Sequence, residues 1–458
     1  MTRQCGGEFC PLFEQSLKEG VAVRVLVVGS GGREHAIVRK LHDDALRLGR
    51  ELSLFAAPGN PGIAQLAECA DVAADDIPGL LALARRLKAD LTVVGPEVPL
   101  SLGIADAFTA AGLRVFGPEA AAARLESSKS FAKEIMRDAG IPTAQSTVFS
   151  RLPAALDYVR TLTPPVVIKA DGLAAGKGVT VARTIAEAQR ALADAMEARA
   201  FGSAGETVVV EQFLRGTELS VMAFVDRSGY RLMPAARDHK AVYDGDEGPN
   251  TGGMGAFAPP RAANGALMAL VRERVFDRLE WYFKAHDIAY RGVLYAGLMV
   301  VDGKPFVIEF NCRFGDPETQ VVLELMDGDL LDVMLAVTED RVASLELKWA
   351  DAAAVCVVLA ARGYPTAYRK GDRIEGLTAA AQLTVARDET QGETDAVRTL
   401  HAGTARRSDG TIVTSGGRVV NVVARGRTLE HARELAYEGA KRVRFDGRHY
   451  RTDIGARG

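Results

Sequence analysis

The chain has 458 residues, enough for about three domains of ordinary size. Hydrophobic residues make up 48% and charged residues 25% of it, a composition typical of a soluble globular protein. The net charge of −3 gives no reason to expect nucleic acid or an anionic membrane as a partner, and no apolar run is long enough to span a bilayer.

Residues 1–22 have no apolar core of signal-peptide length, so we expect no secretion. We predict a disordered N-terminal extension there and assign it no function. The five cysteines of the chain are scattered and odd in number, which suits a reducing cytoplasm better than a disulfide framework.

Residues 23–124 alternate predicted strands with predicted helices. Strands are expected at 23–28, 52–56, 91–94 and 114–116, with helices at 33–48 and 80–88. Each of the first three strands ends in a glycine-rich loop, at 29–32, 58–62 and 95–97. This alternation predicts a doubly wound parallel sheet, in which ligands bind at the carboxyl ends of the strands.

The first of these loops, Gly29-Ser30-Gly31-Gly32, only partly matches a dinucleotide fingerprint. Gly29 and Gly31 fit the first and third positions, but Glu34 stands where the third glycine is needed. No acidic residue closes the second strand to hold a ribose. A dehydrogenase is therefore disfavoured, although the loop can still bind an anion through backbone N–H groups at a helix N-terminus.

Residues 125–335 are expected to form a second domain, with a small flap unit at about 125–195. We predict a helix at 128–139, strands at 166–170 and 179–182, and a helix at 185–198. The turn at 171–178 resembles a P-loop, but its spacing is one residue short and Gly178 replaces the required Ser or Thr. We interpret it as a glycine flap that closes over phosphates, with Lys169 as a nearby point charge.

The remainder of this domain is predicted to be a mostly antiparallel sheet, followed by a small α+β domain at 336–458. Sheet strands are expected at 207–212, 218–225, 293–301 and 306–309, with a long glycine-rich loop at 238–257. The last domain has predicted strands at 352–361 and 419–424 and a helix after residue 428.

The strand that ends in Glu309-Phe310-Asn311 carries the strongest chemical signal. Alternate residues of a strand share one face, so Glu309 and Asn311 present a carboxylate and an amide oxygen side by side. Nucleotide-bound Mg²⁺ takes one or two such protein ligands and fills the rest with phosphate oxygens and water. Arg313 has the same parity and would place a guanidinium beside the same phosphates.

Residues 208–214 form an apolar strand that runs into a polar break. Such a strand exit, around Glu211, Phe213 and Leu214, presents backbone groups that an adenine edge can pair with. Glu218, just beyond it, is placed to accept ribose hydroxyls. On its own this stretch also fits an ordinary edge strand.

Together these segments resemble the ATP-grasp ligases and, more narrowly, the glycinamide ribonucleotide synthetases (phosphoribosylamine–glycine ligases) of purine biosynthesis. The resemblance covers about residues 23–455. It rests on Gly31-Gly32-Arg33-Glu34-His35-Ala36, Pro58-Gly59-Asn60, Gly95-Pro96-Glu97, residues 168–178, Asn250-Thr251-Gly252-Gly253-Met254-Gly255, residues 309–320, His401-Ala402-Gly403-Thr404 and Gly416-Gly417-Arg418-Val419. Ser30 and Ser415 stand where that family commonly has Asn.

The resemblance implies an ATP-grasp core and an activity, with roles for particular residues. ATP would be held by Lys129, Lys169, the flap residues Gly176, Lys177 and Gly178, and by Glu211, Phe213, Leu214 and Glu218. Phosphoribosylamine and glycine would contact Gly31, Gly32, Arg33, Gly59, Asn60, Gly95, Pro96, Glu97, Thr251, Gly252 and Gly253. Glu309 and Asn311 would hold Mg²⁺ or Mn²⁺, Arg313 would stabilise the transferred phosphoryl group, and Asp238 and Asp316 would receive the glycine ammonium.

The implied reaction joins glycine to 5-phosphoribosylamine through glycyl phosphate, with ATP converted to ADP. The alternatives are another ATP-grasp carboxylate–amine ligase or carboxylase, and a non-catalytic nucleotide-binding regulator. Loss of Glu309, Asn311 or Lys169 would have favoured the regulator, and all three are present. We expect a cytoplasmic monomer with small-molecule substrates, open to transient contact with neighbouring purine-pathway enzymes.

Overall fold

The N-terminal unit is a five-stranded parallel sheet. The computed structural model describes residues 22–173, 178–383 and 396–456. The strands lie in the order β3-β2-β1-β4-β5, which confirms the predicted doubly wound sheet. They are β1 (Val23–Gly29), β2 (Leu52–Pro58), β3 (Glu68–Cys69), β4 (Leu91–Val94) and β5 (Val115–Phe116). The helices are α2 (Gly32–Leu48), α3 (Ile77–Leu87), α4 (Glu97–Ser101), α5 (Ile104–Ala110) and α6 (Ala120–Ser127).

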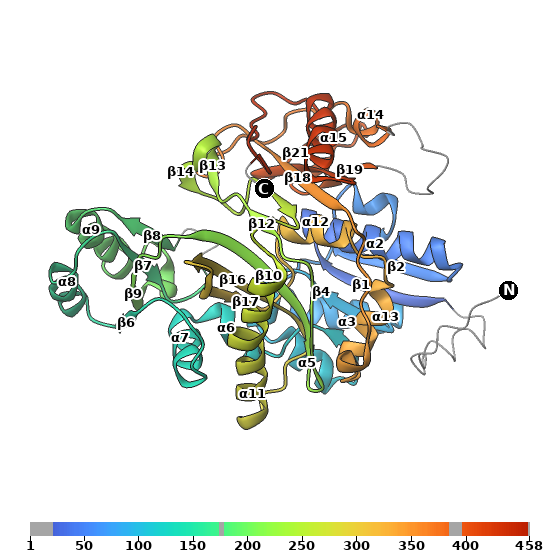
Figure 1. Ribbon diagram of the computed structural model, residues 1–458. Coiled ribbons are helices and arrows are strands. Elements are labelled where there is room, and N and C mark those ends of the chain that lie inside the picture. The colour runs from blue at the N-terminus through green and yellow to red at the C-terminus, as the bar shows by residue number, and fades with distance from the viewer. Residues whose placement is uncertain (1–21, 174–177, 384–395, 457–458) are drawn as a thin grey trace.

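The flap unit is a separate lobe, seen on the left of Figure 1. Its four strands lie in the order β6-β9-β7-β8. They are β6 (Ser146–Phe149), β7 (Val166–Ala170), β8 (Val179–Ala182) and β9 (Val208–Gln212), and the lobe carries α8 (Leu152–Arg160) and α9 (Ile185–Met196). β7 and β8 pair antiparallel, as predicted for a glycine hairpin. Gly176 and Lys177 in its turn lie outside the described residues.

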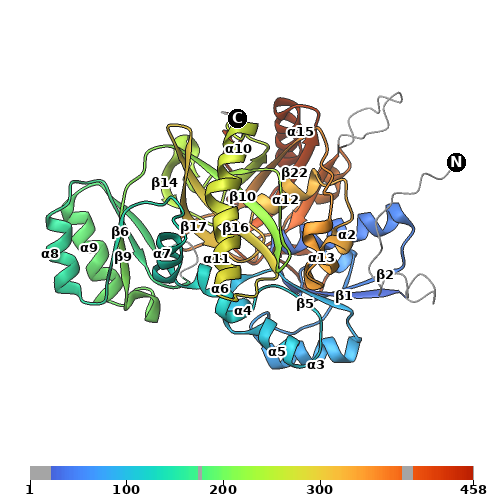
Figure 2. The ribbon, with the colours of Figure 1, turned by 60° about the horizontal axis from the view of Figure 1, so that its bottom comes forward.

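The larger sheet of the second unit is antiparallel, as predicted, in the order β11-β10-β16-β17. The strand predicted at 207–212 does not belong to it, because it is β9 and pairs with β6 and β7 in the flap. Its strands are β10 (Thr217–Asp226), β11 (Gly229–Leu232), β16 (Gly292–Val301) and β17 (Lys304–Asn311). Helix α7 (Lys129–Asp138), α10 (Gly265–Val271), a π-helical turn (Arg272–Phe276) and α11 (Asp277–Ala285) belong to the same unit (Figure 2). The β16–β17 register shifts between Gly297 and Leu298, so a bulge precedes Glu309.

The segment 238–257 is not the single long loop that its composition predicts. It contains β12 (Arg237–Asp238), β13 (Ala241–Tyr243), β14 (Glu247–Asn250) and β15 (Gly255–Ala258). β13 and β14 form a hairpin, while β12 and β15 add to the sheet of the C-terminal unit. The buried Arg451 fixes the hairpin by donating to Ala241 O at 3.1 Å and Asp246 Oδ1 at 2.8 Å. This segment is thus ordered by Arg451, about 200 positions away in sequence. No local sequence pattern indicates such a contact.

The C-terminal unit is built on the sheet β12-β15-β18-β22-β19, which lies at the top of Figure 1. Its own elements are β18 (Ala353–Ala360), α14 (Leu377–Ala381), β19 (Val397–His401), β20 (Thr404–Arg406), β21 (Ile412–Thr414), β22 (Arg418–Gly426) and α15 (Leu429–Arg442). The predicted strands at 352–361 and 419–424 and the helix after residue 428 are confirmed.

One apolar cluster joins the three units. It includes Val25 of the N-terminal sheet, Phe224 of β10 and Val358 of β18, together with residues of α12 (Glu318–Glu324) and α13 (Leu330–Thr338). Phe314, directly after β17, packs on Phe224 with ring centroids 5.9 Å apart. Burial of apolar area is the main force that holds folds together. This shared core therefore fixes the strand ends of the N-terminal sheet, the larger sheet of the second unit and the C-terminal sheet relative to one another.

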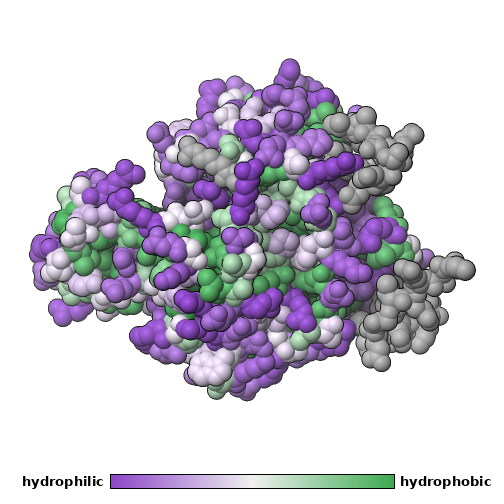
Figure 3. Space-filling view, in the orientation of Figure 1, coloured by the Kyte–Doolittle hydropathy of each residue, from purple (hydrophilic) through white to green (hydrophobic). Residues whose placement is uncertain are grey.

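The surface is mostly polar, and Figure 3 shows it indented where the flap lobe meets the rest of the molecule. In the described part of the chain, no helix combines the length and the apolar composition that crossing a membrane requires.

Two buried histidines join the N-terminal and C-terminal units. His35 on α2 accepts a hydrogen bond at its Nδ1 from the backbone N–H of His401, at 2.8 Å, and the two rings lie 5.8 Å apart. Burial lowers the pKa of His35 well below its usual value and lowers that of His401 to about 4. Both side chains are therefore neutral in the folded chain at neutral pH.

This histidine pair should make stability fall as the pH is lowered from 7.5 to 5.5. In the unfolded chain both histidines bind protons once the pH falls below their ordinary pKa of about 6.5. In the folded chain they stay neutral until the pH reaches their lowered pKa, so between these two pKa values acid favours unfolding. We expect His401→Asn to flatten this pH dependence in urea unfolding curves. His286→Asn, which removes an exposed histidine, is the matched control. If the unfolding free energy of His401→Asn changed with pH as steeply as that of the wild type, this role of the buried histidine pair would be contradicted.

Candidate functional site

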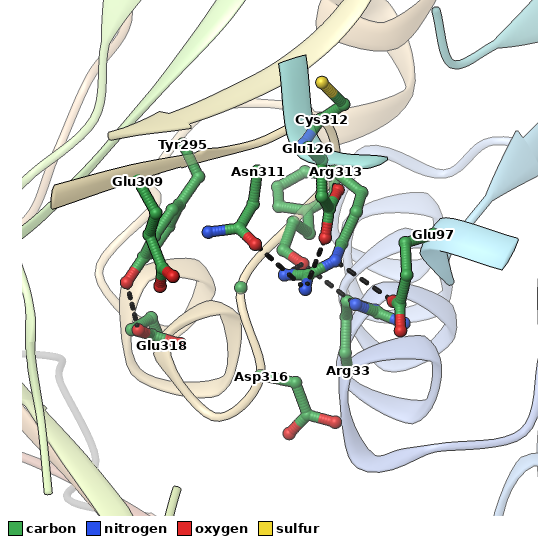
Figure 4. A network of polar contacts seen from close by, with 12 residues as sticks. Arg33, Glu97, Glu126, Tyr295, Glu309, Asn311, Cys312, Arg313, Asp316 and Glu318 are labelled. Atoms are coloured by element: carbon green, nitrogen blue, oxygen red, sulfur yellow. Dashed lines mark hydrogen bonds and ion pairs between the residues drawn. The ribbon is translucent and has the colours of Figure 1, made fainter. Parts of the chain in front are cut away.

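The site forms around the end of β17, where the sequence predicts a metal-binding strand. Glu309 and Asn311 lie on one face of this strand, and Figure 4 shows both side chains pointing into the same space. Cys312 points away from it and contacts Ala122 O through its Sγ. The chain then turns, so that Arg313 lies beside Asn311, with its NH2 group 3.3 Å from Asn311 Oδ1.

Two carboxylates from the N-terminal side hold Arg313 in place. Its Nε lies 3.2 Å from Glu97 Oε2 and its NH2 group lies 2.8 Å from Glu126 Oε1. Glu126 also accepts the backbone N–H of Cys312 at 2.7 Å. Burial alone would raise the pKa of Glu97, but Arg313 and Arg33 outweigh that effect and lower it to about 2. Arg313 is thus fixed as a charged group at the junction of two units.

Lysine ammonium groups surround the Glu309 carboxylate. Lys240 Nζ lies 3.4 Å from Glu309 Oε1 and 3.9 Å from Glu218 Oε2. Lys240, with smaller contributions from Lys169 and Lys129, lowers the pKa of Glu309 to about 2 despite its burial. Lys169 also pairs with Glu211, and Arg313 pairs with Glu97 and Glu126, so these cations have carboxylate partners. Four cations gathered at one strand end suit a polyanionic ligand, whose phosphate oxygens can replace such partners.

Lys169 and Lys129 are each held by a neighbouring polar group. Lys169 Nζ lies 2.9 Å from Glu211 Oε2 and donates to Ile308 O at 2.8 Å, while Lys133 pairs with the other oxygen of Glu211 at 3.1 Å. Lys129 donates to Gly172 O at 2.8 Å, at the base of the flap. The Glu211 side chain is therefore buried between two lysines, and only the backbone of this residue can face a nucleotide base. Phe213, Leu214 and Gly178 lie at the edges of the same lobe.

The three glycine-rich loops of the N-terminal sheet meet beside Arg313. Arg33 donates to Phe314 O at 3.0 Å, and Gly31 N–H donates to Glu34 Oε2 at 2.6 Å. Asn60 ties the loops together, because its Nδ2 donates to Ser30 O at 2.8 Å and to His401 O at 3.0 Å. Gly32 begins α2, Gly59 precedes Asn60, and Gly95 and Pro96 lead into Glu97 at the start of α4.

The loop Thr251-Gly252-Gly253 and two aspartates form the opposite side. Thr251 donates through Oγ1 to Lys240 O and accepts the N–H of Gly253 at 2.9 Å. Gly253 has φ +107°, and a Cβ there would lie 2.7 Å from Asp238 Oδ1. That buried oxygen has no hydrogen-bond partner among the described residues. Burial, with the nearby Glu318 carboxylate, raises the pKa of Asp238 well above its ordinary value. Asp316 accepts Gln320 Nε2 at 2.7 Å.

Two residues of this site, Lys240 and Glu126, have no assigned role in the sequence-based prediction. Lys240 lies within a glycine-rich stretch and gives no periodic signal, and Glu126 lies in the last turn of α6, far in sequence from the strand end that it supports. Lys240 could have been identified from the sequence, because a lysine two residues after Asp238 lies on the same face of an extended chain.

The residues at the end of β17 fit a magnesium or manganese ion bound to a nucleotide. Glu309 and Asn311 supply the hard oxygen ligands that such ions prefer, and Glu309 is ionised. Among the described residues, no group of three or more His, Cys, Asp or Glu side chains is placed to hold a metal. A site with two protein ligands therefore needs phosphate oxygens and water to complete its coordination.

Comparison with known proteins matches all three units to one family. The N domain of phosphoribosylglycinamide synthetase matches residues 23–126, its ATP-grasp (A) domain residues 127–319 and its C domain residues 354–457. A relative from Caldanaerobacter subterraneus subsp. tengcongensis, named phosphoribosylamine–glycine ligase, is 45% identical over 434 residues, which are 95% of this chain and 100% of the relative.

Solved structures agree with this assignment. The crystal structure of phosphoribosylamine–glycine ligase from Thermotoga maritima has a TM-score of 0.79 and 35% identity, and the match covers 94% of this chain and 100% of that one. The biotin carboxylase domain of a Hydrogenobacter thermophilus 2-oxoglutarate carboxylase, solved with MgADP, shares the fold at 15% identity and a TM-score of 0.69, over 93% of this chain and 91% of that one. The sequence-based resemblance is confirmed: the chain belongs to the phosphoribosylglycinamide synthetase family.

Proposed function

We propose that this protein is an ATP-dependent ligase that joins glycine to 5-phosphoribosylamine, giving glycinamide ribonucleotide, ADP and phosphate in purine biosynthesis. The observation that carries the proposal is the convergence of Lys129, Lys169, Lys240 and Arg313 on the Glu309–Asn311 strand end. The family match over three units supports the same activity.

The cluster of cationic side chains at the end of β17 supports binding of the ATP phosphates there. Lys169 and Lys129 would exchange their present partners, a carboxylate and a carbonyl, for phosphate oxygens as ATP enters. The adenine would lie against the exit of β9 near Glu211, Phe213 and Leu214, with Glu218 on the ribose. Gly176, Lys177 and Gly178 of the flap would cover the phosphates. Because phosphoryl transfer depends on positioning and charge neutralisation, this arrangement needs no covalent help from side chains.

The metal ligands in this proposal are Glu309 and Asn311. We propose Mg²⁺ as the physiological ion, with Mn²⁺ able to replace it, since both accept carboxylate, amide, phosphate and water oxygens. When bound, the ion would neutralise charge on the phosphate oxygens. Arg313, fixed by Glu97 and Glu126, would stabilise the charge that develops on the transferred phosphoryl group.

The two other substrates would meet between the N-terminal loops and the 251–253 loop. The glycine carboxylate attacks the γ-phosphorus of ATP, so that ADP leaves and glycyl phosphate forms. The amine of phosphoribosylamine then attacks the acyl carbon, the C–O bond to phosphate breaks, and the amine loses a proton as the amide forms. Asp238 and Asp316 would hold the glycine ammonium, while Gly31, Gly32, Arg33, Gly59, Asn60, Gly95, Pro96 and Glu97 would bind phosphoribosylamine. The enzyme would work as a monomer in the cytoplasm, and the three free cysteines among the described residues suit a reducing compartment.

The test is phosphate release from ATP with glycine and phosphoribosylamine varied separately. We expect release only when both are supplied with Mg²⁺, because the acyl phosphate is protected until an amine accepts the acyl group. A carboxylase would turn over ATP with bicarbonate and without glycine. A non-catalytic regulator would bind ATP but release no phosphate under any combination, and either result would overturn the proposal.

A further inference from the structure

The C-terminal unit holds both backbone polar groups of Gly252. Tyr364, in the loop after β18, accepts the N–H of Gly252 at its hydroxyl, at 3.0 Å. Arg418, the first residue of β22, donates from NH1 to Gly252 O. A Cβ at Gly417 would clash with the Tyr364 ring, so the small residue before Arg418 lets this tyrosine approach. Two side chains from one unit thus fix the backbone of a loop in another.

Arg418 also fixes Asp316. Its NH1 group donates to Asp316 O at 2.9 Å and its NH2 group to Asp316 Oδ2 at 3.1 Å. Gln320 donates to the other carboxylate oxygen, Oδ1, at 2.7 Å. The Arg418 side chain is 22% exposed and that of Asp316 is 16% exposed, so solvent screens this ion pair only partly. One guanidinium therefore joins the 251–253 loop to the turn that follows β17.

Asp316 lies between the loops assigned to the two substrates. A Cβ on Gly31, in the N-terminal unit, would lie 3.6 Å from Asp316 Oδ2. Gly253, on the other side, packs against Asp238 and Pro317. The Arg418 contacts are thus made where an amine bound at the N-terminal loops would approach an acyl group bound at the 251–253 loop. The lysines around Glu309 are not among the partners of Arg418.

We propose that Arg418, assisted by the Tyr364 hydroxyl, is a positioning residue that aligns Asp316 and the 251–253 loop for the amino-acid substrate. This inference rests on the proposed function. A planar guanidinium directs several N–H groups at fixed angles and so serves Gly252 O, Asp316 O and the Asp316 carboxylate at once, which a lysine ammonium on a flexible stem does not match. The Gly416-Gly417-Arg418 motif of the C-terminal unit thereby acquires a role in the ligation site.

The test compares Arg418→Met, Arg418→Lys and Tyr364→Phe in steady-state ligation. We expect Arg418→Met to raise the KM for glycine at least about tenfold and to lower kcat, because charge-assisted hydrogen bonds to both loop and carboxylate are lost. Arg418→Lys should recover only part of this loss. Tyr364→Phe, which removes one hydroxyl, should raise the KM for glycine by about two- to tenfold. The KM for ATP should stay within about twofold in all three, since Arg418 does not contact the ATP side.

The matched control is Arg425→Met, which removes another arginine of β22. Arg425 donates to Glu324 O at 3.3 Å and lies 3.6 Å from Asp327, both away from the 251–253 loop. The inference is overturned if Arg418→Met changes the KM values for glycine and ATP equally, if Arg425→Met has the same glycine-specific effect, or if Arg418→Met behaves as wild type. Failure of the proposed function would instead appear in the unmodified enzyme, as phosphate release that does not depend on glycine.

Discussion

Replacing Glu309 with alanine is expected to lower ligase turnover at least about 10³-fold while the chain still folds, because this carboxylate is the only charged protein ligand assigned to the metal. Its loss leaves Lys240, Lys169 and Lys129 without their shared counter-charge. ADP binding measured without metal should therefore be retained or strengthened, and the gain in affinity on adding Mg²⁺ should disappear. Isothermal titration with ADP, with and without Mg²⁺, measures both effects.

Two further variants make the Glu309 result specific. Glu309→Asp keeps the charge on a shorter side chain and should retain part of the activity. Glu280→Ala removes a carboxylate that is also paired with a lysine, Lys284 at 2.5 Å, but lies on α11 away from β17, and it should behave as wild type. Near-normal turnover of Glu309→Ala with Mg²⁺ would show that the metal is held elsewhere.

Local patterns were sufficient to predict β1, β2, β4 and β5 of the N-terminal sheet and the β7–β8 hairpin of the flap, but not β3, β6 or the place of β9 in the flap sheet. The strands β4, β7 and β8 have the bounds that their apolar runs indicate, since a buried strand between glycine-rich turns leaves a clear pattern in sequence. The shared face of Glu309 and Asn311 was predictable for the same reason, because strand parity survives up to the end of β17.

Contacts between units could not be predicted in this way. Glu126 reaches Arg313 across 187 positions and Arg418 reaches Asp316 across 102, and neither pairing has a periodic signature. The strands at 237–258 escaped prediction because they are two to four residues long and pair mainly with distant segments or with each other around a tight turn. Their glycine and proline content favours a loop on local grounds. The resemblance to a family supplied the chemistry of these regions but not their geometry.

Arg313→Met is expected to lower kcat about 10³-fold or more, the range found where an arginine stabilises a transferring phosphoryl group. It should also destabilise the chain by about 3–5 kcal/mol, because Glu97 and Glu126 would remain as buried carboxylates without their cation. Burial already raises the pKa of Glu126 above its ordinary value, and loss of Arg313 should raise it further, so the stability deficit should be larger at pH 7 than at pH 5. Urea unfolding at both pH values and single-turnover ADP formation measure the two effects separately.

A double variant separates the catalytic role of Arg313 from its structural role. Arg313→Met with Glu126→Gln removes one of the stranded charges, while the glutamine oxygen can still accept the backbone N–H of Cys312. We expect the double variant to regain part of the lost stability, because an unpaired buried carboxylate is replaced by a neutral amide. Its kcat should stay as low as that of Arg313→Met, since no cation faces the phosphoryl group. Recovery of turnover together with stability would show that Arg313 acts only by holding the units together.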